Sequence, residues 1–96
     1  MKDKLFIILA ADTTPYDSKG WGFGYVALPQ GHPWYGLRTD DIPCSVHGNL
    51  SYSELIDEHW VIGFDTLHLN DTIEKWPMSA VLKEARNLLK QAQDVC

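Results

Sequence analysis

Three side chains that can bind a metal ion or move a proton recur at three-residue intervals in this sequence. They are Asp65, His68 and Asp71, and they follow a short apolar segment. Imidazole titrates near neutral pH, and both imidazole nitrogens and carboxylate oxygens ligate divalent ions. At this spacing, neighbouring pairs would share one face of a helical turn or converge on an ion from a loop. His47, at the end of an earlier expected strand, is a fourth candidate ligand.

Simpler roles compete with metal binding at these positions. The spacing matches no zinc signature, such as two His four residues apart with an intervening Glu. In these simpler roles, Asp65 caps the following turn and His68 is hydrogen-bonded within the fold. Residues 39–76 carry eight acidic side chains and one Lys, and acidic runs are usually solvated. No cofactor is therefore assigned, and a divalent metal ion is kept as an alternative.

Other chemistry has weaker support. Cys44 near His47 could form a thiolate–imidazole pair, but no family signature surrounds the Cys. The segment Gly20–Tyr25 has neither of the common glycine-rich phosphate-binding spacings. Catalytic residues stay unknown, and a non-enzymatic role is favoured.

Large aromatic side chains are frequent for a chain of this length. They could stack on a planar ligand such as a nucleobase, although most are expected in the core. They are Trp21, Phe23, Tyr25, Trp34, Tyr35, Tyr52, Trp60 and Phe64.

The elements that position these residues follow from local patterns. Lys4–Ala11 is an apolar run typical of a strand buried on both faces. Gly20–Leu28 predicts a second strand that ends at Pro29, with aromatic residues on one face and glycines on the other. Repeated strand glycines indicate close approach of another backbone or a ligand, or a kink or bulge. Residues 29–43 show no period and predict a structured loop.

Further strands and one helix are predicted in the second half. Short strands at 44–48 and 50–53 would flank a turn at Gly48-Asn49, and His59–Asp65 is the clearest later strand. Ser79 is expected to cap a helix from about Ala80 to Gln93, because apolar residues recur there at helical spacing. These elements predict an α+β fold, with a mostly antiparallel sheet of four to five strands packed against one C-terminal helix.

Length and composition limit the class of protein. The 96 residues fit a single domain, 1–96, and 45% hydrophobic content predicts a folded globular chain. A net charge of −5 disfavours direct nucleic-acid binding. The apolar run Leu5–Ala11 is far shorter than the roughly 20 residues of a membrane span. Two cysteines cannot form a disulfide scaffold. We therefore expect a soluble intracellular protein. A homodimer is compatible with the small size of the chain.

Several sequence blocks between Gly24 and Asp71 stand out by order and identity. They read GYV with Pro29, GHP and YG over residues 24–36, VHGNLSYS over 46–53, and WVIGFD over 60–65 with His68 and Asp71. These blocks resemble a family of small phage- and prophage-encoded proteins, in which they run as GYV-x-hP-x-GHP-x-YG, VHGGLTYS and W-x-x-GFD-x-AH-x-GD. The chain departs at Asn49, Thr66 and Asn70, where Gly, Cys and Gly are common in the family.

The resemblance implies the biological context in which the protein acts, but no reaction mechanism. Small phage accessory proteins commonly act on the host, so the expected function is counter-defence in the cytoplasm of an infected or lysogenic bacterium. The protein would bind a host defence protein, as anti-CRISPR proteins do, or a nucleotide-derived signal. The side chains expected to line the ligand-binding site are His32, Tyr35, His47, Tyr52, Asp65, His68 and Asp71.

Two alternatives stay open beside a plain structural or virion-associated role. One is a small metal-dependent hydrolase in which a metal-bound water is the nucleophile and the four candidate ligands hold the ion. The other is an acidic nucleic-acid mimic, in which carboxylates stand in for phosphates and block a DNA-binding nuclease. The acidic residues in question are Asp40, Asp41, Glu54, Asp57, Glu58 and Glu74.

Overall fold

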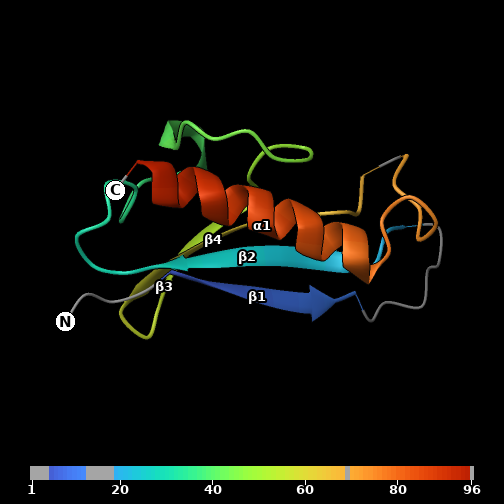
Figure 1. Cartoon of the computed structure of the whole chain (residues 1–96), viewed down its shortest axis with the longest axis horizontal. Coiled ribbons are helices and arrows are strands. Elements are labelled where there is room, and N and C mark those ends of the chain that lie inside the picture. Colours follow the sequence, from blue (N-terminus) through green and yellow to red (C-terminus); the bar gives the residue numbers. More distant parts are fainter. Residues whose placement is uncertain (1–4, 13–18, 69, 96) are drawn as a thin grey trace.

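A four-stranded antiparallel sheet carries one long helix on one of its faces (Figure 1). The computed structural model describes residues 5–12, 19–68 and 70–95. Its elements are β1 (Phe6–Ala11), β2 (Gly22–Leu28), η1 (Thr39–Asp41), β3 (Tyr52–Ile56), β4 (His59–Asp65) and α1 (Met78–Asp94). The strand order is β1-β2-β4-β3. The predicted α+β fold is thereby confirmed.

The core lies between the sheet and α1. Val26, Leu28, Ile62 and Phe64 from the two central strands meet Val81, Ala85 and Leu88 from the helix. Gly24 allows the close packing, because a Cβ there would lie 2.7 Å from the Phe64 ring and 3.3 Å from the Ala85 Cβ. Close approach does occur at Gly24, but by the side chains of Phe64 and Ala85 rather than by the backbone or ligand that the sequence predicted. The loop after β2 adds Trp34, Ile42 and Val46 to the same core.

β1, an edge strand, exposes one of its faces, so the prediction that it is buried on both faces is wrong. Phe6 and Ile8 are 44% and 39% exposed, whereas Ile7 and Leu9 alternate with them and pack against the core. A short apolar run has the same sequence pattern whether one or both faces of the strand are covered.

The third strand lies later in the chain than predicted. Residues 44–48 form no strand, and 46–49 form a turn in which the Asn49 N–H donates to the Val46 carbonyl over 3.0 Å. β3 instead joins β4 through a tight turn at Asp57 and Glu58, whose φ angles are 48° and 69°. Positive φ at both turn positions is usually supplied by Asn or Gly, so the sequence gives no hairpin signal there.

The helix begins at Met78 rather than near Ala80, and Pro77 rather than Ser79 is its N-cap residue. The Pro77 carbonyl accepts hydrogen bonds from the N–H groups of Ala80 and Val81. Proline fits the start of a helix because its missing N–H would have no intrahelical partner there. In the described ranges, no helix has the length and apolar content needed to cross a bilayer.

Candidate functional site

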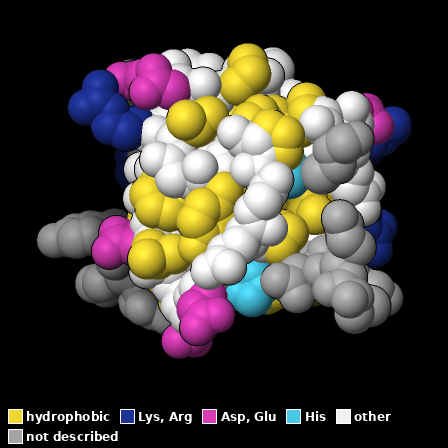
Figure 2. All heavy atoms as spheres, turned by 90° about the vertical axis from the view of Figure 1, so that its left-hand side faces the viewer, with side chains coloured by type: hydrophobic (Ala, Val, Ile, Leu, Met, Phe, Trp, Pro, Cys, Tyr) yellow, Lys and Arg dark blue, Asp and Glu magenta, His cyan; other side chains and the backbone are white. Residues whose placement is uncertain are grey.

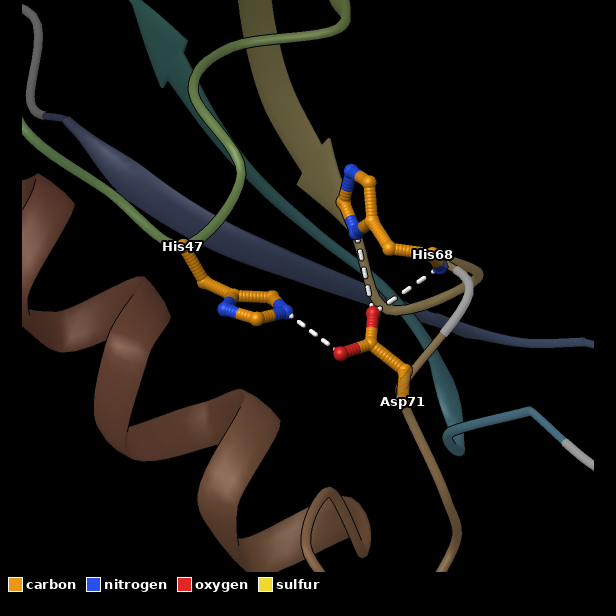
Figure 3. A group of neighbouring side chains, drawn as sticks. All are labelled: His47, His68 and Asp71. Atoms are coloured by element: carbon orange, nitrogen blue, oxygen red, sulfur yellow. Dashed lines mark hydrogen bonds and ion pairs between the residues drawn. The ribbon is translucent and has the colours of Figure 1, made fainter.

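His47, His68 and Asp71 converge beside α1 (Figure 3). The two imidazoles approach the Asp71 carboxylate from different segments of the chain. The distance from His47 Nε2 to Asp71 Oδ1 is 2.8 Å, and that from His68 Nδ1 to Asp71 Oδ2 is 2.9 Å. One ligand atom from each residue lies within 4.8 Å of the others. We call these three residues the His–Asp–His cluster.

The chain after β4 folds so that Asp71 faces back toward His68. The His68 N–H donates to Asp71 Oδ2 over 2.9 Å, and the Asp71 N–H donates to the His68 carbonyl over 2.9 Å. Asp65, the last residue of β4, accepts a hydrogen bond from the Leu67 N–H, as expected for a turn cap. Its Oδ1 also lies 3.5 Å from His68 Nδ1. The structure therefore brings His47, His68 and Asp71 together within 4.8 Å, and Asp65 contacts this group through His68.

Asp71 is the buried, negatively charged centre of the cluster. Burial alone would raise the pKa of its carboxyl group, but hydrogen bonds from the His68 N–H, the His68 ring and the His47 ring outweigh this effect. The net result is a pKa below the ordinary value. An ionised carboxylate only accepts hydrogen bonds, so His47 Nε2 and His68 Nδ1 carry the donated protons.

His47 is held from the other side by residues that the sequence analysis missed. Its ring lies against the Trp76 indole, with centroids 4.1 Å apart, and its backbone N–H donates to Glu84 Oε2 over 2.7 Å. Glu84 belongs to the polar side of a periodic helix, and nothing in its local sequence distinguishes it from a solvated residue. The cluster is closed at Asp71 but open at His68, whose side chain is 41% exposed, so a small ligand can reach it.

Gly48 is required by the position of His68, and Gly48→Ala tests this. Gly48 has φ +68°, and a Cβ there would overlap the His68 ring. Gly36 also has a positive φ, 82°, but its Cβ would meet nothing within 4 Å. Gly36→Ala therefore reports backbone strain alone. We expect Gly48→Ala to lower the free energy of unfolding by about 1 kcal/mol more than Gly36→Ala, as measured by urea denaturation. Equal losses would mean that the ring does not constrain residue 48.

The other three predicted ligand residues lie elsewhere. His32 is buried, its Nε2 donates to the Ala92 carbonyl over 2.8 Å, and its Nδ1 accepts the Trp34 N–H over 2.9 Å. The Tyr35 hydroxyl donates to the Glu58 carbonyl over 3.1 Å. Tyr52 lies on the sheet. His32 and Tyr35 thus attach the loop after β2 to its neighbours.

A thiolate at Cys44 is disfavoured. Burial raises the pKa of its thiol, and a reactive thiolate needs the opposite shift. The His47 ring is also engaged by Asp71 through Nε2.

A comparison of this chain with protein-family models, curated proteins and solved structures finds no match. The resemblance to phage-encoded proteins therefore stays an expectation, and the functional conclusion rests on the geometry of the residues.

Proposed function

We propose that the protein binds a divalent transition-metal ion through His47, His68 and Asp71. The proposal is carried by the convergence of two imidazoles and one carboxylate within 4.8 Å. Two His and one carboxylate are a ligand set of catalytic zinc and non-haem iron sites. Three protein ligands leave coordination positions for water or a substrate, and the exposed side of His68 gives access to them.

The observed geometry is close to what an ion requires. The ion would replace the two protons that His47 Nε2 and His68 Nδ1 now share with Asp71. Zinc ligands at about 2.0–2.1 Å in a tetrahedron stand roughly 3.3 Å apart. The nitrogen–oxygen pairs at 2.8 and 2.9 Å, which use different carboxylate oxygens, therefore need to open by about half an ångström, and the wider separations, up to 4.8 Å, need to close. Asp65, whose Oδ1 lies 3.5 Å from His68 Nδ1, can accept a hydrogen bond from a water on the ion.

This site favours the metal-dependent hydrolase among the functions expected from the sequence. A metal ion lowers the pKa of its bound water toward neutrality and so supplies a hydroxide nucleophile. Phosphate oxygens are also good metal ligands, so a nucleotide-derived signal is a suitable substrate class. We propose that this activity serves counter-defence in the cytoplasm of an infected or lysogenic bacterium, as the resemblance implies.

The acidic-mimic alternative needs closely spaced carboxylates over an extended surface. Figure 2, which views the left-hand end of Figure 1, shows acidic side chains at separate places around the edge. Hydrophobic side chains lie between them. This face of the molecule therefore gives no support to the mimic.

Titration of chelator-treated protein with Zn²⁺, Mn²⁺ or Co²⁺ tests the metal site. We expect one ion per chain, and an affinity that falls at acidic pH because the imidazoles must be neutral to bind. His47→Gln and His68→Gln should each weaken binding by about 100-fold, at least as much as losing a supporting hydrogen bond to a ligand. His59→Gln is the matched control, since His59 lies in the β3–β4 hairpin. If all three variants bind the ion equally well, the cluster is not the site.

A further inference from the structure

The face of the sheet opposite α1 carries a connected set of aromatic side chains. No described element crosses this face (Figure 1). Phe23 and Tyr25 from β2 stack with ring centroids 6.2 Å apart, and Tyr25 meets Tyr52 of β3 edge-to-face at 5.3 Å. The Tyr25 ring lies on the backbone of Gly63, where any Cβ would overlap it. The rings therefore form a fixed platform, which we call the tyrosine platform.

A carboxylate lies beside the tyrosine platform. Asp65 follows Gly63 on the same face of β4, since alternate strand residues share a face. Burial, and then the charges of Tyr52 and Asp65, raise the pKa of Tyr25, as expected if both groups lie close to its hydroxyl. The four strands contain no Lys or Arg. The basic residues Lys83, Arg86 and Lys90 lie instead along a groove on α1, on the other side of the sheet.

Apolar side chains surround the platform on the same face. Phe6 and Ile8 of β1 and Ile56 of β3 are 44%, 39% and 42% exposed. Their register with β2 and β4 places them on the side of Tyr25. Exposed apolar side chains gathered on one face are typical of interaction surfaces.

We propose that this open face docks a basic protein surface, with an arginine of the partner stacked on Tyr25 and paired with Asp65. Guanidinium groups favour the combination of an aromatic face and a carboxylate. Charge complementarity selects this occupant. A second copy would bring together two acidic faces without cations, and nucleic-acid phosphates would be repelled. Surfaces rich in Arg are typical of proteins that bind nucleic acid, so docking would occlude such a surface. Asp65 borders both this surface and the His–Asp–His cluster, since its Oδ1 lies 3.5 Å from His68 Nδ1, whereas the aromatic rings of the platform belong to β2 and β3.

The probe is a synthetic nonapeptide of alternating Arg and Gly. Its affinity is compared with that of a control peptide in which neutral citrulline replaces every Arg. Titrations use ¹⁵N-labelled protein at low salt with chelator present, so that metal binding does not contribute. We expect amide shifts on β2, β3 and β4, and about tenfold weaker binding by Tyr25→Leu and by Asp65→Asn. The controls Tyr35→Phe and Glu74→Gln should change the affinity by less than about twofold.

Three results would overturn the proposal. The first is equal binding of the citrulline peptide. The second is an effect of Glu74→Gln as large as that of Asp65→Asn, which would indicate diffuse attraction to acidic side chains. The third is a stable dimer, seen by sedimentation of the free protein, in which Tyr25→Leu restores the monomer, because a second copy would then cover the face. None of these outcomes depends on metal binding by the His–Asp–His cluster.

Discussion

Asp71→Asn is expected to cost about 3 kcal/mol of unfolding free energy and to remove metal binding. The buried carboxylate accepts three hydrogen bonds, from the His68 N–H, the His68 ring and the His47 ring. Hydrogen bonds to charged groups contribute about 1.5–3 kcal/mol each, and an amide nitrogen facing an imidazole N–H leaves donors opposed. Urea denaturation at pH 7 measures the loss. Asp65→Asn, at a position where the side chain is 23% exposed, is the control for stability and should cost less than about 1 kcal/mol.

The same carboxylate makes stability depend on pH. The pKa of Asp71 is lowered in the folded protein, so the unfolded chain binds this proton first as the pH falls. The stabilisation is fully present above the ordinary carboxyl pKa of about 4 and is lost as the pH falls through the lower folded value. Asp71→Asn should therefore show a shallower fall in unfolding free energy below about pH 4 than the unmodified protein. An identical acid profile in the two proteins would contradict this.

His32→Ala is expected to lower the unfolding free energy by about 2–3 kcal/mol while leaving metal affinity within about twofold. The change removes the acceptor of the Trp34 N–H, the bond to the Ala92 carbonyl, and a ring packed 5.4 Å from the Trp34 indole. His32→Asn should lose less, because its side-chain oxygen can still accept the Trp34 N–H.

Measurements of stability and of metal affinity together distinguish two roles for His32, as a ligand residue or as a structural residue. The sequence grouped it with the candidate ligand residues, whereas its observed contacts fix the loop after β2 to the end of α1. Denaturation and metal titration on the same His32→Ala sample distinguish them. A normal stability together with lost metal binding would restore His32 to the site.

Part of the candidate site was predictable because it is local. Asp65, His68 and Asp71 follow one another closely in the chain after β4, and both carboxylates contact His68, as their spacing predicts. His47 lies 24 residues from its partner Asp71 in sequence. Its approach depends on packing against Trp76 and Glu84, and no local pattern encodes a contact of that range.

The sequence by itself determined the elements whose signal is periodic and local: the strands Gly22–Leu28 and His59–Asp65, the helix, and with them the α+β class. Tertiary structure alone decided which strand lies at the edge and which hairpin forms. It also decided which of the seven expected ligand residues lie at the His–Asp–His cluster and which lie elsewhere. The physical reason is range. Hydrophobic periods of two or 3.6 residues report one element's own burial, whereas strand order and covered faces depend on contacts between distant segments. That same long-range packing leaves Tyr25 and Tyr52 on an uncovered face and places His47 against Asp71.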